Sequence, residues 1–201
     1  MRILDQRVTD DLRAGRPLRL HLGCGEIEIE GFYGVDRIAL PGVAIEADLD
    51  EPLGLLPNDC VADVRSSHCF EHVREFLPLM GELYRIVRPG GRLIIEVPHF
   101  SNPYAWSDPT HVRTFGLYTM FYFVKTELQP RRKVPCFYSS ARFRVRKTWI
   151  TPMPRTWFDR LAFPFMGTII NRSLAWQDWY ERRICRAFPA WGIGYEMTPD
   201  K

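Results

Sequence analysis

The chain has 201 residues, 46% of them hydrophobic, which is enough for one α/β domain with a sizeable core. No run of eighteen apolar residues occurs, which argues against a membrane-spanning helix, and Met1–Asp5 lacks the apolar stretch of a secretory signal. Five cysteines without a Cys-x-x-Cys pair argue against a disulfide framework or a structural zinc site. We therefore expect a protein of the reducing cytoplasm.

The net charge of +3 hides an asymmetry between the two halves of the chain. Residues 1–98 carry 11 Lys and Arg against 17 Asp and Glu, a balance of −6. Residues 99–201 carry 16 against 7, a balance of +9. Such a split concerns binding partners rather than the fold.

The first chemically informative stretch runs from Leu18 to Asp36. Leu18–Leu22 alternates as a buried strand does and stops at a turn, Gly23-Cys24-Gly25, and a second short strand ends in Asp36. Glycine lets the backbone approach a ligand closely, and a carboxylate can accept two hydrogen bonds from a ribose diol. These are parts of a nucleoside-binding unit, although Gly-x-Gly alone is equally compatible with a tight turn at a strand exit.

The spacing refines this interpretation. Asp36 follows Gly23 by thirteen positions, whereas the acid of a dinucleotide site follows its glycines by about twenty. A full crossover helix barely fits into this interval. The loop therefore favours a nucleoside that carries no pyrophosphate.

The remaining first half alternates strands with one long helix, which predicts a parallel, doubly wound sheet with its first five strands in the order 3-2-1-4-5. The helix starts at Glu71, shows helical spacing of apolar residues and stops at Pro89-Gly90-Gly91. His72 lies on it and is interpreted as a structural or capping residue. The expected elements are a lead-in helix within 1–17, strands at 33–36, 43–47, 61–66 and 93–97, and the helix 71–88.

The second half begins with a polar loop, 99–113, which leaves the fifth strand at the sheet edge where open α/β sheets bind ligands. We expect an aromatic-rich helix at 116–125, a strand at 142–150 with basic side chains alternating onto one face, a helix at 177–188 and a strand at 193–198. The aromatic segment 152–180 is expected to bury against a second subunit, as in a homodimer, or to roof an acceptor site, with loose membrane-surface contact as a weaker option. Its aromatic residues are Trp157, Phe158, Phe163, Phe165, Trp176 and Trp179.

Five segments over about residues 18–100 resemble, in order, the motifs of the class I S-adenosylmethionine-dependent methyltransferases, and of their short-glycine-loop branch in particular. The resemblance implies a Rossmann-like, seven-stranded, mostly parallel sheet with an elaborated C-terminal half and an antiparallel last strand. It also implies a single domain over 1–201, with a cofactor-binding core at 18–98 and acceptor-side elements at 99–191. The segments are Leu20–Gly25, Val35-Asp36, Ala47–Leu49, Ser66–Val73 and Leu83–Leu93.

The resemblance implies S-adenosylmethionine as cofactor and S-adenosylhomocysteine as product. Asp36 would hold the ribose, Asp48-Leu49 would lie against the adenine, and Ser67-His68 would lie beneath the cofactor. His21 stands where the family usually has the Asp or Asn that helps to hold the methionine end. The expected cofactor-binding residues are His21, Leu22, Gly23, Cys24, Gly25, Asp36, Arg37, Asp48, Leu49, Ser67 and His68.

His111 is the first candidate for a catalytic base, because imidazole titrates near neutral pH and Asp108 could orient it. His99 is the second candidate, and Arg113 is expected to help position the substrate. Alternatively, Asp108 caps a short helix over Pro109 and His111 packs beneath it. A metal site built from His99, Asp108 and His111 is an alternative, but its ligand set is short and not helix-spaced, so no metal is predicted.

The run Asp108–Arg113 also resembles a segment of relatives that are associated with sugar and cell-surface glycan modification. We therefore expect O-methylation of a sugar or similar polar small molecule, which could also bear phosphate on the basic residues of 131–147. Those residues are equally compatible with a solvated face, and no nucleic-acid-binding module is recognised. N-methylation of a small amine and a non-catalytic subunit that supports a partner enzyme remain as alternative functions.

Overall fold

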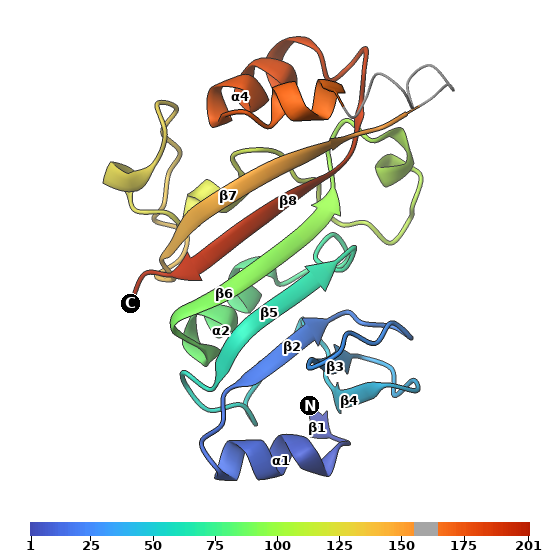
Figure 1. The fold of residues 1–201 in the computed structure, drawn as a ribbon, viewed down its shortest axis with the longest axis vertical. Helices are drawn as coiled ribbons and strands as arrows, with labels where there is room; N and C mark the ends of the chain where they lie inside the picture. The colour runs from blue at the N-terminus through green and yellow to red at the C-terminus, as the bar shows by residue number, and fades with distance from the viewer. Residues whose placement is uncertain (155–164) are drawn as a thin grey trace.

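The computed structural model describes residues 1–154 and 165–201. Its strands form one sheet in the order β1-β4-β3-β2-β5-β6-β8-β7 (Figure 1). None of the helices in these two ranges has the length and apolarity that crossing a bilayer requires. The strands are β1 (Arg2–Ile3), β2 (Leu18–Leu22), β3 (Tyr33–Asp36), β4 (Val43–Glu46), β5 (Val61–Ser67), β6 (Val87–Pro98), β7 (Phe143–Pro152) and β8 (Ala190–Pro199).

The predicted order of the first five strands is confirmed, because β4, β3, β2, β5 and β6 are neighbours and pair in parallel. The antiparallel last strand is also confirmed, since β8 pairs antiparallel with both β6 and β7. The expected total of seven strands is wrong. Within the described residues the sheet has eight, because Arg2–Ile3 adds a short antiparallel edge strand to β4 before the lead-in helix begins.

Within the described residues, the predicted helices are shorter than expected or replaced by a 3-10 turn. The α-helices are α1 (Gln6–Arg13), α2 (Phe76–Ile86) and α4 (Leu174–Arg183), with 3-10 turns η1 (Pro103–Trp106), η2 (Thr119–Phe123) and η3 (Thr126–Leu128), and residues 165–170 are also helical. The aromatic-rich helix expected at 116–125 is only the 3-10 turn η2. The Phe121 carbonyl accepts the Val124 N–H that closes this turn, and the buried Gln129 amide also donates to the carbonyls of Phe121 and Val124, so the chain does not continue into an α-helix.

The helix expected from Glu71 begins instead at Phe76, because two side chains pull its first residues out of helical geometry. Asp50 Oδ1 accepts hydrogen bonds from the backbone N–H groups of Arg74 and Glu75, at 2.6 and 2.8 Å. The Arg113 guanidinium donates to the carbonyls of Val73 and Arg74. Residues 71–75 therefore form a loop at the carboxyl end of β5, where their side chains can line a site.

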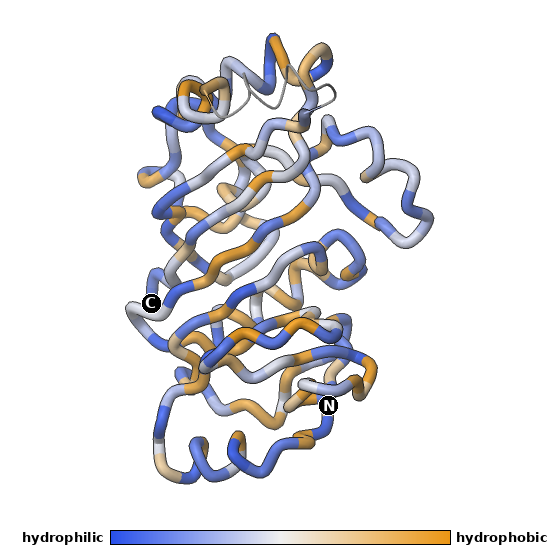
Figure 2. The backbone as a smooth tube through the Cα atoms, turned by 45° about the vertical axis from the view of Figure 1, so that its right-hand side comes forward, coloured by the Kyte–Doolittle hydropathy of each residue, from blue (hydrophilic) through white to orange (hydrophobic). Residues whose placement is uncertain are grey.

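One face of the sheet carries the hydrophobic core. Val8 of α1, the buried face of α2 and Tyr180 of α4 join a single cluster with one row of strand residues. That row pairs across four strands as Leu20, Val64, Leu93 and Met197. In Figure 2 hydrophobic residues gather along the central strands, whereas α1 is largely hydrophilic.

The opposite face is polar, so the expectation of a doubly wound sheet is wrong for the described part of the chain. Its corresponding row is His21, Arg65, Ile94 and Glu196, and no described helix crosses in front of β5 or β6 in Figure 1. The connections 23–32, 37–42 and 47–60 contain no helix that could cover this face. Alternation of apolar and polar residues along β2 and β6 suits a sheet with one solvated face.

The basic residues of β7 do not alternate regularly, because the pairing with β8 shifts between Val145 and Lys147. Arg144 lies on the polar face and bonds to Asp200 at 2.7 Å, whereas Arg146 falls in the irregularity. The expected row of basic side chains is therefore broken by a β-bulge.

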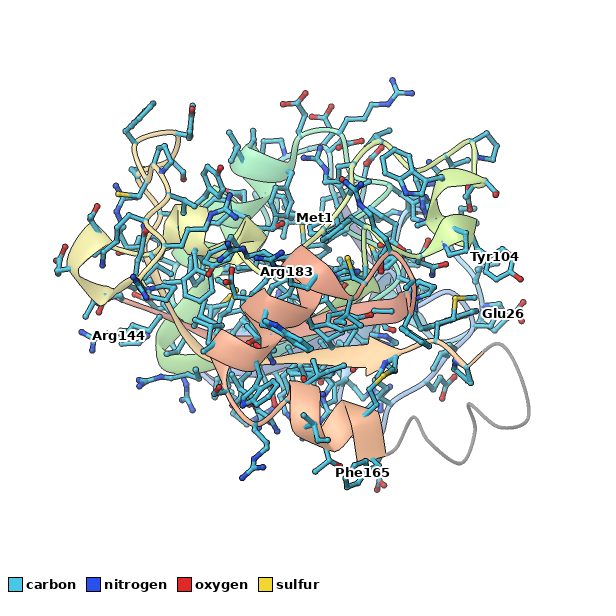
Figure 3. The ribbon with its side chains drawn as sticks, turned by 90° about the horizontal axis from the view of Figure 1, so that it is seen from above. Met1, Glu26, Tyr104, Arg144, Phe165 and Arg183 are labelled. Atoms are coloured by element: carbon cyan, nitrogen blue, oxygen red, sulfur yellow. The ribbon has the colours of Figure 1, made fainter. Side chains whose placement is uncertain are left out.

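The aromatic segment at 152–180 lies only partly within the described residues, since Trp157, Phe158 and Phe163 fall outside them. Phe165 is 71% exposed and lies at the periphery in Figure 3. Trp176 and Trp179 are 43% and 47% exposed, and their rings meet edge to face. Burial against a second subunit, an acceptor roof and membrane contact remain predictions.

Candidate cofactor and active site

The glycine turn after β2 needs glycine for two separate reasons. Gly23 has φ +65°, and a Cβ placed on it would lie 2.4 Å from Cys69 Sγ. Gly25 has φ +53° and donates its N–H to Asp36 Oδ2 at 2.9 Å. Burial raises the pKa of Cys69 to about 12 and that of Cys24 to about 11, so both thiols stay protonated near neutral pH.

A cavity of about 640 Å³ opens at the carboxyl ends of β2 to β5. Its lining includes six of the predicted cofactor residues, Gly23, Asp36, Arg37, Asp48, Leu49 and His68. The volume lies within the range of about 300–1,000 Å³ that small-molecule sites occupy. The Gly23 turn keeps its floor clear of a side chain, and Asp36 presents a carboxylate at its wall, so these residues fit a nucleoside cofactor.

Five predicted cofactor residues do not line this cavity. Leu22 is fully buried in the core, and Cys24, Gly25 and Ser67 lie beside the cavity rather than on its wall. His21 is 5% exposed and lines a second cavity of about 400 Å³, between β3 and the loop before it. Burial lowers the pKa of His21, which favours the neutral imidazole there.

The loop after β6 returns to the cavity and brings its polar residues against the loop 71–75. Pro109, Thr110 and Val112 line the cavity together with His72, and the backbone N–H of Val112 donates to the Glu71 carbonyl at 2.9 Å. The His72 and His111 rings meet edge to face with centroids 4.8 Å apart. The predicted base, His111, is therefore not part of the cavity lining itself but contacts His72, which is.

His111 is held with one particular nitrogen free. Its Nδ1 lies 2.8 Å from the Ala105 carbonyl, which can only accept, so in the neutral imidazole Nδ1 carries the proton and Nε2 carries the lone pair. Nε2 lies 3.6 Å from Asp108 Oδ2 and 4.0 Å from Glu71 Oε1. A histidine fixed in this tautomer can accept a proton or bind a cation at Nε2.

His72 is fixed in the same way, through Thr110. The Thr110 hydroxyl donates to Asp108 Oδ1 at 2.5 Å, so it accepts from His72 Nδ1 at 2.9 Å. The Nε2 of His72 is then the nitrogen with the lone pair. Asp108 therefore orients His72 through a hydroxyl, and it only approaches His111.

Glu71 lies beneath these histidines and is 1% exposed. Neither of its carboxylate oxygens has a hydrogen-bond partner among the residues that the structure describes. His68 Nδ1 lies 3.4 Å from Oε1, and this carboxylate raises the pKa of His68. His68 also has φ +52°, a conformation that is uncommon outside glycine and that recurs at functional sites.

His99 and Arg113 do not reach the cavity. The His99 ring is fully buried and lies between Ser101 and Glu181, with both ring nitrogens bonded. The Arg113 guanidinium is engaged with the carbonyls of the loop 71–75 and stacks on the Phe76 ring. Burial lowers the pKa of Arg113. Both residues therefore support the framework of the site, and neither is part of the reaction that we propose below.

Four residues of this cluster are not predicted from the sequence as site residues. The pattern indicates only a helix start for Glu71 and a structural or capping role for His72, and no motif indicates a role for Asp50 or Thr110. A signal was available in part, because Glu71-His72 follow closely on the end of β5, where open α/β sheets bind ligands. Their pairing with His111 depends on the return of the loop 99–113, which local periodicity does not encode.

No family model matches the chain, and no curated protein matches it. Among solved structures, the fold is similar to a SAM-dependent methyltransferase from Archaeoglobus fulgidus, with TM-score 0.55 and 17% identity over 96% of this chain and 91% of that one. It is similar to the YcgJ protein of Bacillus subtilis, with TM-score 0.52 and 12% identity over 98% of each chain. The fold is also similar to a chain in the complex between the Haloferax volcanii Trm112 methyltransferase activator and a proposed methyltransferase. That similarity has TM-score 0.52 and 13% identity over 91% of this chain and 81% of the other.

These likenesses concern the fold. The mixed eight-stranded sheet of this chain is the Rossmann-like fold of the S-adenosylmethionine-dependent methyltransferases. At identities this low the activity, the acceptor and the site residues do not follow from the likeness. They have to be argued from the cavity and the side chains around it.

Proposed function

We propose that the protein is an S-adenosylmethionine-dependent methyltransferase that methylates a hydroxyl group of a sugar or similar polar small molecule. The observation that carries this proposal is the cavity of about 640 Å³, which Gly23, Asp36 and Asp48 line on one side and His72 and Thr110 line on the other. The residues predicted to hold the nucleoside and His72 of the histidine cluster therefore line the same cavity. Such a cavity suits a reaction between a nucleoside cofactor and a polar acceptor.

The nucleoside end would lie on the turn at Gly23, with the ribose on Asp36. Asp36 Oδ1 and Oδ2 each accept one backbone hydrogen bond, from Ile38 and Gly25, and each retains a lone pair for a ribose hydroxyl. Leu49 is buried to 8% exposure beside exposed Asp48, so this corner offers an apolar surface with a polar rim to the adenine. When bound, the cofactor supplies both the methyl group and its leaving group.

The acceptor would lie against the histidine cluster. His111 Nε2 carries a lone pair and can take the proton of a hydroxyl, and a positioned base contributes about 10²- to 10⁴-fold to a rate. Arg37 and Arg74 also line the cavity and could hold an anionic group of the acceptor, such as a phosphate. Orientation of the acceptor by these residues would contribute further, roughly 7 kcal/mol or more in favourable cases.

Calorimetry with S-adenosylhomocysteine tests the cofactor assignment. We expect wild type to bind and Asp36→Ala to bind about 10-fold or more weakly, because the hydrogen bonds to the ribose and to Gly25 are lost. Asp10→Ala is the matched control, since Asp10 is an exposed residue of α1 whose side chain accepts a hydrogen bond from Gln6 and lies outside the cavity lining. Equal affinity of wild type and Asp36→Ala would remove the assignment.

A further inference from the structure

We infer that Glu71, His72 and His111 form a binding site for one divalent transition-metal ion beside the cofactor cavity. One ligand atom of each residue lies within 4.8 Å of the others. The inference rests on the proposed function and deepens it, because the cation would lie where the acceptor is expected. It concerns a different residue set from the one that the sequence suggested, since His99 is enclosed in the core.

The first argument is the state of Glu71. A carboxylate that is buried without a hydrogen-bond partner costs free energy, and a fold retains one where something compensates it. Glu71 is 1% exposed, and its two oxygens have no hydrogen-bond partner within residues 1–154 and 165–201. The nearest basic side chains are two imidazoles that approach only Oε1, with His68 Nδ1 at 3.4 Å and His111 Nε2 at 4.0 Å, and neither contact has the geometry of a hydrogen bond. A divalent cation would satisfy both oxygens.

The second argument is the tautomer of the two histidines. Metal-bound histidine typically donates its other ring N–H to a carbonyl, carboxylate or water, which fixes the orientation of the ring. His111 donates Nδ1–H to the Ala105 carbonyl, and His72 donates Nδ1–H to Thr110, whose hydroxyl is anchored on Asp108. In both rings, therefore, the hydrogen bond at Nδ1 fixes the orientation, and the Nε2 lone pair is free to bind an ion.

The third argument is accessibility combined with spacing. Ligands at about 2.0–2.2 Å from an ion lie about 3–4 Å from one another, so the three side chains must close by roughly 1 Å. His72 is exposed and lines the cavity, and rotation of its ring can provide this closure. Glu71 is fixed beneath it by the backbone hydrogen bond from Val112. An ion can therefore enter from the cavity, and its remaining coordination positions would face the acceptor.

The donor set selects the class of ion. Two imidazoles with one carboxylate suit Zn²⁺, Mn²⁺, Fe²⁺ or Co²⁺, whereas Mg²⁺ and Ca²⁺ prefer oxygen ligands only. A bound cation lowers the pKa of a hydroxyl that coordinates to it. The O–H bond of the acceptor would then break with its electron pair left on oxygen and its proton passed to solvent water. With the ion bound, His111 serves as a ligand and no longer takes this proton.

The experiment is a titration of the full chain with Co²⁺, after a chelator has removed any bound metal. Binding is measured by the visible d–d absorption of the Co²⁺ ion. We expect one Co²⁺ per chain for wild type, and at least 10-fold weaker binding for Glu71→Gln and for His72→Ala. His72 is exposed, so His72→Ala tests the site without removing a core side chain. Glu75→Gln is the matched control, because Glu75 is exposed, lies four residues further on and is outside the cluster, and it should bind as wild type does.

Absence of stoichiometric Co²⁺ binding to wild type at about 1 mM would overturn the inference, and so would equal affinity of wild type and Glu71→Gln. Both results would leave the proposed function standing, since S-adenosylhomocysteine calorimetry on metal-free protein tests that separately. Conversely, loss of Co²⁺ in the two cluster variants with unchanged S-adenosylhomocysteine affinity would support the site independently of any acceptor. Addition of Co²⁺ should also raise the Tm of wild type and of Glu75→Gln, but not that of Glu71→Gln.

Discussion

The loop that leaves β6 contains two histidines, each with a carboxylate nearby, and the two pairs are built in opposite ways. His99 Nδ1 accepts from the Ser101 backbone N–H at 3.1 Å, so its Nε2 carries the proton and donates it to Glu181 at 3.0 Å. Glu181 also accepts from the Leu117 N–H at 2.5 Å. His111 carries its proton on Nδ1, and its Nε2 and both oxygens of Glu71 lack hydrogen bonds in the described structure.

The difference separates a structural pair from the pair that we propose to be reactive. In the first pair the hydrogen-bonding capacity of His99 and Glu181 is used within the protein, and the histidine ring has no exposed surface. In the second pair the Nε2 lone pair of His111 and the carboxylate of Glu71 are free to bind a substrate or an ion. Both pairs consist of a histidine and a glutamate, so their hydrogen bonds, rather than their residue types, distinguish the two roles.

The largest effect should come from removing the structural histidine. His99→Ala leaves a cavity and strips a hydrogen bond from Glu181, so we expect a loss of about 3 kcal/mol of unfolding free energy. For a domain of this size that corresponds to a fall in Tm of about 6–12 °C, which thermal unfolding would detect. His72→Ala serves as the matched control, because His72 is exposed and should change stability by less than about 0.5 kcal/mol. A His99→Ala protein as stable as wild type would contradict the distinction between the pairs.

The next effect concerns the reactive histidine. His111→Ala should lower turnover by about 10²-fold or more, whether the imidazole acts as base or as ligand, while the affinity for S-adenosylhomocysteine stays within a few-fold. The measurement is single-turnover methyl transfer to an identified acceptor, together with calorimetry. Near-normal turnover would place the activating group elsewhere. A parallel loss of cofactor affinity would show instead that His111 supports the cavity wall.

The cofactor half could be predicted from sequence because its signals are local. The glycines and Asp36 lie within thirteen positions of one another, and the strand periodicity on either side places them at one sheet edge. The sequence of β2, Leu-Arg-Leu-His-Leu, also indicates one polar face of the sheet, because polar residues alternate with leucines. The short connections after β2 and β3 leave no room for the helices of a doubly wound sheet.

The acceptor half could not be predicted to the same depth, because its roles depend on contacts between distant segments. His99 and His111 are equivalent in sequence, both in a polar loop after the same strand. What separates them is Glu181, eighty-two residues away in α4, and Glu71, which Asp50 and Arg113 hold out of the helix. No periodicity or motif reports such contacts.

A smaller effect is expected for the carboxylate of the reactive pair. Glu71→Gln replaces an unsatisfied buried carboxylate with a neutral amide of the same shape, so the unfolding free energy of the metal-free protein should stay within about 1 kcal/mol or rise. Denaturant unfolding with chelator present measures this. Glu181→Gln is the paired variant, and it should destabilise the protein, because Glu181 accepts from both His99 and Leu117. A loss above about 2 kcal/mol for Glu71→Gln would show that Glu71 is a structural carboxylate after all.

The smallest effect should come from Asp108, because it acts on the cluster through another group. Its Oδ1 accepts from the Thr110 backbone N–H and hydroxyl, at 2.8 and 2.5 Å, and the Thr110 hydroxyl in turn fixes His72. Its Oδ2 lies 3.6 Å from His111 Nε2, and the Asp108 side chain is 42% exposed, so solvent weakens that attraction. Asp108→Asn keeps an oxygen that can accept from Thr110, and we expect a fall in turnover of only a few-fold.

Thr110→Val tests the same contacts, because Thr110 lies between Asp108 and His72. It removes the hydroxyl that orients His72 and keeps the shape of the side chain, so the affinity for Co²⁺ should fall further than in Asp108→Asn. If Asp108→Asn instead lowers turnover as much as His111→Ala does, the Asp108 carboxylate acts on His111 directly. Asp108 Oδ2 and His111 Nε2 would then be in hydrogen-bonding contact during the reaction, and Thr110→Val should have little effect on turnover.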